Sequence, residues 1–120
     1  MRISQKYDLQ ERLVKFSASI ITNINGLNKD FASEHLAKQL IRSSTSSALN
    51  YGEAQAAESR RDFIHKMKIC LKELRESQVN LQVLKEARLI NDLDEFNKII
   101  QECKELVAIF TSSVKTTATK

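Results

Sequence analysis

Apolar residues recur along the chain at alternating steps of three and four, a spacing that places side chains on one face of a helix. The pattern occupies four segments and predicts helices over about residues 8–27, 33–52, 59–87 and 92–114. The third segment repeats every seven residues, which forms the seam of a helix that lies lengthwise against its neighbours. This seam consists of Phe63, Met67, Cys70, Leu74, Ser77, Leu81 and Leu84.

Residues at the starts of these segments support the predicted limits. Asp8, Ser33, Ser59 and Asp92 are the expected N-caps, because their side-chain oxygens can accept hydrogen bonds from the free amides of a first helical turn. A glutamate follows Asp8 and Asp92 three residues later, as in a capping box. Gly26 tolerates a left-handed backbone and is expected near the end of the first helix.

The second segment contains a serine-rich run over residues 42–48 with almost no bulky side chains. Serine clusters often form polar linkers. In a helix, the same small side chains would let neighbouring backbones approach closely. Leu40–Ile41 before the run and Ala48–Leu49 after it keep helical spacing, so a continuous helix is the favoured interpretation.

The third and fourth segments are separated by only a few residues around 89–91, and short connections join antiparallel neighbours. Pairing across this turn places Ser77 opposite Cys103 and Cys70 opposite Phe110. The two cysteines are then offset by roughly 10 Å along the axis, too far for a disulfide, so we expect free thiols in the core. The chain is therefore predicted to be all-α, one domain over residues 1–120 that forms an antiparallel up-down-up-down four-helix bundle.

The composition agrees with long helices and narrows the class of protein. Proline is absent and glycine occurs only twice, whereas a sandwich or barrel needs many turns. The first residues lack the apolar core of a signal peptide. The longest purely apolar run, residues 106–110, is far shorter than the ~20 residues of a membrane span. We therefore expect a cytoplasmic protein with no membrane partner.

The sequence contains no constellation typical of an active site. His35 and His65 stand apart, and Cys70 and Cys103 fall on core positions, where thiols are usually inert. There is no Cys-x-x-Cys, no Glu-x-x-His pair of the kind that holds metals in bundles, and no glycine-rich phosphate loop. We therefore expect no enzyme activity, no catalytic residues, no metal and no cofactor.

A line of basic residues runs along the third segment, opposite its apolar seam. Its members are Arg61, His65, Lys68, Lys72 and Arg75, with Arg60 and Lys66 beside them. Such a line can follow a phosphate backbone, which makes RNA or another nucleic acid a candidate partner. No aromatic residue stands in it to stack on bases, so we do not expect this line to read the sequence of a single strand. The alternative is a solvated outer surface, because the net charge is only +4 and charged helix faces are common.

Apolar residues outside the main seams support a different hypothesis. They are Val14, Ile21, Ile64, Leu71 and Ile109, and a lone bundle need not bury all of them. A subunit interface would. The chain is therefore also a candidate for a structural or protein-interaction oligomer that has no role with nucleic acid.

Three stretches, residues 39–53, 59–64 and 69–76, resemble the four-helix bundle proteins encoded in 23S ribosomal RNA intervening sequences, and the likeness extends over nearly the whole chain. Members usually carry a glutamine, an arginine three residues later, a serine and an Asn-Ile-Ala-Glu-Gly run, and then a glutamate in the next helix. The matching positions are Gln39, Arg42, Ser46, Asn50, Glu53 and Glu76. Ala48 stands where the family often has proline, and the glycine of the run has moved to Gly52. These departures affect the local backbone rather than the fold.

The resemblance implies a homo-oligomer, with a pentameric ring as the expected form, whose molecular role is not established. A related accessory protein of diversity-generating retroelements is thought to engage nucleic acid and a reverse transcriptase. The resemblance thus adds a second copy of the chain, RNA or another nucleic acid, and a nucleic-acid enzyme as expected partners. The matching positions listed above become a candidate polar network around the serine-rich run. For Arg42 and Glu53, local capping and solubility are equally good explanations.

Overall fold

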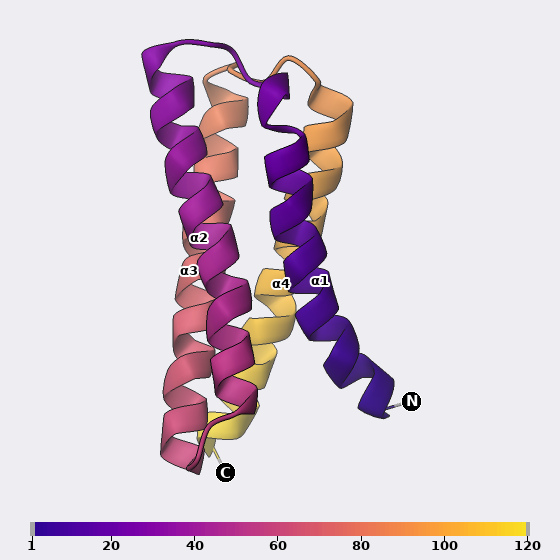
Figure 1. Ribbon diagram of the computed structural model, residues 1–120, viewed down its shortest axis with the longest axis vertical. Helices are drawn as coiled ribbons and strands as arrows, with labels where there is room; N and C mark the ends of the chain where they lie inside the picture. The colour runs from indigo at the N-terminus through magenta and orange to yellow at the C-terminus, as the bar shows by residue number, and fades with distance from the viewer. Residues whose placement is uncertain (1, 120) are drawn as a thin grey trace.

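The computed structural model describes the backbone of residues 2–119 and the side chains of residues 9–117. Four helices follow one another as α1 (Arg2–Thr22), α2 (Phe31–Gln55), α3 (Arg60–Glu86) and α4 (Leu93–Thr119). A short 3₁₀ turn, η1 (Ile24–Gly26), comes after α1. The helices run alternately up and down (Figure 1), so the predicted all-α antiparallel four-helix bundle is confirmed.

The first two helices begin elsewhere than predicted. α1 starts at Arg2, so Asp8 lies inside the helix and is not its N-cap. Residues 2–7 contain neither proline nor glycine, and nothing in them interrupts a helix. The N-cap of α2 is Asp30, whose carboxylate accepts a hydrogen bond from the Ser33 amide at 2.8 Å. Ser33 is therefore a buried residue of the first turn and not the cap.

The predicted caps of the last two helices are confirmed. Ser59 Oγ accepts a hydrogen bond from the Asp62 amide at 3.0 Å, and Asp92 Oδ1 accepts one from the Glu95 amide at 3.3 Å. α2 and α4 end later than predicted. α2 continues through Gly52 to Gln55, and α4 continues past residue 114 to Thr119.

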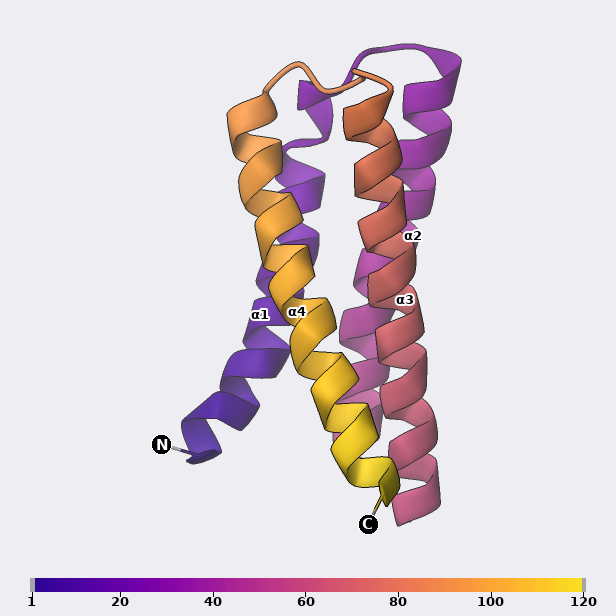
Figure 2. The ribbon, with the colours of Figure 1, turned by 180° about the vertical axis from the view of Figure 1, so that it is seen from behind.

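The serine-rich run is helical, as predicted, and it faces α3. Ser43, Ser44 and Ser47 are buried, and Ser43 Oγ lies 2.7 Å from Ser77 Oγ across the interface. Their hydroxyls also donate to backbone carbonyls of their own helix; Ser47, for example, donates to the Ser44 carbonyl at 2.6 Å. These bonds satisfy buried polar groups that would otherwise destabilise the fold. The small side chains bring α2 and α3 together along most of their length (Figure 2).

The core contains the predicted seam of α3 and both thiols. Cys70 and Cys103 are free and buried. The Cys103 thiol lies 3.6 Å from the Leu74 carbonyl and the Cys70 thiol 3.5 Å from the Ser47 carbonyl, so the two thiols have different neighbours. The prediction of two separate core thiols is confirmed. The largest fully buried side chains around them are Phe16, Phe96 and Phe110.

Contacts outside the core also tie the helices and loops together. Arg12 of α1 donates to both carboxylate oxygens of Glu102 on α4, at 3.0 and 2.7 Å, and reaches Glu105 at 3.1 Å. At one end of the bundle, the loop after α1 and the loop after α3 meet in an antiparallel bridge between Leu27 and Ile90. In the part of the chain that the structure describes, no helix is both long and apolar enough to cross a membrane.

Candidate functional site

The predicted basic line lies on the outside of α3, opposite the apolar seam. Its five members, Arg61, His65, Lys68, Lys72 and Arg75, are exposed and share one face of the helix. Arg60, which is exposed, and Lys66, which is half-buried, lie on the two flanks of this face. The carboxylates near them divide that face into two parts.

Arg61, His65 and Lys68 form what we call the open stretch of α3. Together with Arg60 and Ile64 they line a hollow of about 530 Å³. Among the described side chains, none of the carboxylates lies within ion-pair distance of the three residues of the open stretch. Arg60 donates to the Thr117 carbonyl at 2.6 Å. The open stretch therefore presents positive charge that the molecule does not neutralise.

Further along α3, and on its flank, the same residue types already have partners. Lys72 lies 3.6 Å from Glu76, and Arg75 reaches the Thr111 hydroxyl at 3.4 Å. Lys66 donates to Glu53 at 2.6 Å, and this hydrogen bond raises the pKa of Lys66. We call Lys72 and Arg75, with Arg42 and Glu76, the paired stretch.

The predicted polar network is present as separate pairs rather than one connected network. In addition to the Glu53–Lys66 pair, the Asn80 amide donates to Gln39 at 3.4 Å. Asn50 donates to the Ser46 carbonyl at 2.9 Å within α2. Arg42 binds Glu76 at 3.1 Å. All six predicted positions thus have polar contacts, but only Arg42, Glu76 and Lys72 form a larger cluster.

Arg42 also joins this cluster to a residue that the sequence did not indicate, Glu73. Glu73 is only 6% exposed, and its Oε1 atom has no hydrogen-bond partner. Its nearest cation is Arg42, whose Nη1 lies 3.6 Å away, which is an ion pair without a hydrogen bond. A buried carboxylate is costly unless a cation compensates it, so Arg42 has a structural role here.

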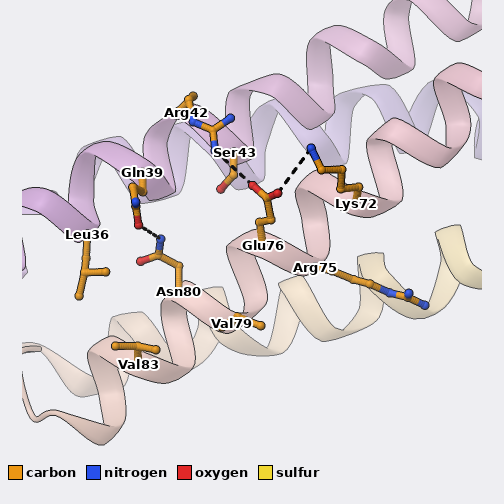
Figure 3. Close-up of a pocket in the computed structure, with 10 residues that line it drawn as sticks. All are labelled: Leu36, Gln39, Arg42, Ser43, Lys72, Arg75, Glu76, Val79, Asn80 and Val83. Carbon is orange, nitrogen blue, oxygen red and sulfur yellow. Dashed lines mark hydrogen bonds and ion pairs between the residues drawn. The ribbon is translucent and has the colours of Figure 1, made fainter.

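A groove of about 640 Å³ lies between α2 and α3, next to the paired stretch (Figure 3). Arg42, Lys72, Arg75 and Glu76 lie toward one end of it. Toward the other end its lining is apolar, with Leu36, Val79 and Val83. Val79 is 58% exposed and Val83 43% exposed, so the chain leaves these side chains uncovered.

The comparisons with known proteins agree with this architecture. The model of the 23S rRNA-intervening sequence protein family matches residues 5–112. The chain belongs to this family. A crystal structure of a protein of unknown function from the S23 ribosomal protein family of Bacteroides thetaiotaomicron is 30% identical, with a TM-score of 0.77 over 89% of this chain and 98% of that chain. A search among curated proteins found no match.

Within the 23S rRNA-intervening sequence protein family, the positions that match the family pattern now have structural roles. Arg42 compensates Glu73 and Glu76, and Gln39 and Glu53 bind residues of α3. The pattern therefore holds α2 against α3. Gly52 has a packing role as well, because a Cβ there would lie 3.3 Å from Gln10 Oε1 of α1.

The described residues offer little for metal or nucleophilic chemistry. No group of three or more His, Cys, Asp or Glu side chains among them is arranged to hold a metal ion. Burial raises the pKa of the Cys70 and Cys103 thiols to about 12. Thiols are nucleophilic as thiolates, so both cysteines are poor nucleophiles near neutral pH.

Proposed function

We propose that this family member is a non-enzymatic, homo-oligomeric bundle that binds RNA or another nucleic acid through the basic face of α3. The observation that carries the proposal is the open stretch. Arg61, His65 and Lys68 expose their side chains over a hollow that has no carboxylate in its lining. Phosphates are the anions that such a linear set of cations fits best.

The energetic basis is the release of counterions from the nucleic acid. Each phosphate that a lysine or arginine neutralises frees a condensed cation, so affinity falls steeply as salt concentration rises. Cations that already have a carboxylate partner contribute less, because binding must first break the internal pair. The open stretch should therefore supply most of the affinity, with Lys72 and Arg75 in secondary roles.

The test is binding of a structured RNA, including 23S ribosomal RNA fragments, measured by fluorescence anisotropy over a range of salt concentrations. Lys68→Glu combined with Lys72→Glu should abolish binding at low salt. Lys98→Glu combined with Lys104→Glu on α4 makes the same change in net charge away from α3 and should have a smaller effect. No binding of the natural protein at low salt would contradict the proposal, and so would equal loss in both double variants.

A second candidate function is a structural or protein-interaction oligomer without a nucleic-acid role. Exposed apolar side chains favour it: Val14 and Ile21 on α1 are 52% and 47% exposed, and Val79 and Val83 border the α2–α3 groove. These are two different surfaces, and contact between unlike surfaces generates rings rather than two-fold dimers. A pentameric ring is one such closed assembly.

Light scattering at micromolar concentration tests the homo-oligomer in both proposals. A mass five times that of the chain would support the ring, and a monomer would contradict it. The two candidate functions then differ in the RNA experiment alone, because only the first requires binding that depends on Lys68.

A further inference from the structure

The groove between α2 and α3 has a composition that suits a flat, partly apolar ligand. Leu36 contributes from α2, and Val79 and Val83 contribute from α3 (Figure 3). Its volume of about 640 Å³ falls within the range of small-molecule sites. None of its lining residues is aromatic, so a ring that entered it would lie against aliphatic side chains.

Two amides stand at the middle of the groove and are only weakly engaged with each other. The Asn80 Nδ2 atom is 3.4 Å from Gln39 Oε1, a long hydrogen bond. Asn80 Oδ1 is buried and has no hydrogen-bond partner in the described part of the structure. A buried acceptor without a donor is unfavourable. If the Asn80 amide turns toward the groove, it gives up only the long contact with Gln39 and can accept a hydrogen bond from an N–H group of a ligand.

Side-chain amides are well matched to the edges of nucleobases. An asparagine or glutamine presents one acceptor and one donor group, the same pairing that bases present on their edges. The cations at the other end of the groove are Arg42, Lys72 and Arg75, while Glu76 supplies the one carboxylate in the lining. The lining thus carries net positive charge at the end from which the basic line continues toward Lys68.

We infer that the α2–α3 groove receives one unpaired nucleobase of a nucleic-acid strand whose phosphates lie along the basic face of α3. This inference rests on the proposed nucleic-acid function and specifies the form of the ligand. A base in a duplex has its face stacked and its pairing edge occupied. Only an unpaired nucleotide can present both to a protein.

The experiment uses an unstructured single-stranded RNA that contains one 2-aminopurine, and the same strand annealed to its complement. The single strand should bind about tenfold more tightly than the duplex, because only the single strand can bury a base against the aliphatic lining of the groove. The emission of 2-aminopurine should increase on binding, because the base leaves its stacked neighbours for a site without aromatic residues.

Variants separate the base site from the phosphate contacts. Val83→Glu and Asn80→Leu should each remove most of the preference for the single strand and leave binding of the duplex unchanged. Leu49→Glu is the control for Val83→Glu, because it introduces the same charge at an exposed aliphatic residue of α2 that does not line the groove, and it should preserve the preference. Lys68→Glu should weaken binding of both ligands. Circular dichroism checks that each variant is folded.

The outcomes distinguish the two proposals. Equal affinity for both ligands, with no change in emission, overturns the base site and leaves the proposed function standing. No binding of either ligand overturns both. If Val83→Glu dissociates the oligomer while Asn80→Leu leaves RNA binding intact, the groove belongs to a second copy of the chain and the base site is wrong.

Discussion

The open and paired stretches of α3 have the same kinds of side chain on the same helix face and yet differ in their surroundings. Arg61, His65 and Lys68 face solvent with no carboxylate in the hollow beside them. Lys72 lies next to Glu76, which also binds Arg42 of α2. Carboxylates on α3 itself and on α2 therefore decide which of the basic residues remain available to a ligand.

Because of this difference, the charges in one part of α3 stabilise the fold, while those in another part are available for binding. In the paired stretch, charge holds α2 against α3 and compensates a buried carboxylate. In the open stretch, charge contributes nothing comparable to the fold and is free to contact phosphates. Substitutions can therefore show whether the two stretches really have different roles.

The largest effect of a single substitution is expected in the paired stretch, from Arg42→Ala. The change leaves Glu73 buried without its cation. Because Arg42 is itself 62% exposed and water can partly replace it, we expect a loss of about 2 kcal/mol in the free energy of unfolding. Urea denaturation measures it. Adding Glu73→Gln should restore part of the loss, whereas Lys38→Ala, at an exposed position one turn earlier on α2, should change stability little.

The second prediction concerns the core. Burial raises the pKa values of the Cys70 and Cys103 thiols to about 12. Unfolded thiols lose their protons near pH 8.5, while the folded ones keep theirs. The unfolded state therefore binds fewer protons, and stability should fall as pH rises through this window. The slope for each thiol is small at pH 8 and approaches about 1.4 kcal/mol per pH unit toward pH 10, where the unfolded thiol is ionised. Denaturation between pH 8 and 10 should show a smaller slope in a Cys70→Ala, Cys103→Ala variant.

A third prediction compares two lysines that are two residues apart on α3. Lys68→Ala should weaken RNA binding severalfold and lower the dependence of log affinity on log salt by about 1. Lys66→Ala should change neither quantity appreciably, because Lys66 is already bound to Glu53. Anisotropy titrations at several salt concentrations give both numbers. Equal effects of the two changes would contradict the idea that an internal ion pair makes a lysine less available to RNA.

The smallest effect is expected for Arg75, which is exposed like the open stretch but has one weak internal contact. Its contact with the Thr111 hydroxyl is long, at 3.4 Å, so Arg75→Ala should alter the free energy of unfolding by less than about 0.5 kcal/mol. If the same variant weakens RNA binding as much as Lys68→Ala does, Arg75 belongs functionally to the open stretch. Lys104→Ala on α4 is the control for a general loss of charge.

The helices were predictable because the residues buried along one face of a helix recur at steps of three and four in the sequence. Most helix limits lie within one turn of the predicted ones. The misplaced ends have physical reasons. Ser33 and Asp30 are both good caps, and only the structure shows that Asp30 is used. The second helix was predicted to end at Gly52, but one glycine costs a helix only about 1 kcal/mol, and α2 continues through it to Gln55.

The candidate site was harder to predict, because it depends on the register between α2 and α3. The residue numbers of three pairs across this interface, 42 with 76, 39 with 80 and 53 with 66, add to 118 or 119. The same rule applied to the α2–α3 turn would have placed Arg42 near Glu73 and Glu76. It would not have identified the open stretch, since that requires knowing which carboxylates are absent from the surroundings.

The bridge between Leu27 and Ile90 has a consequence for how the bundle opens. It is flanked by hydrogen bonds from the Asn28 amide to the Leu89 carbonyl and from the Asn91 amide to the Gly26 carbonyl. The two interhelical loops at that end must therefore separate together, whereas both chain termini leave from the opposite end (Figure 1). Amide protons at the bridge should exchange with solvent in one concerted event, and fraying should proceed from the end where the chain begins and finishes.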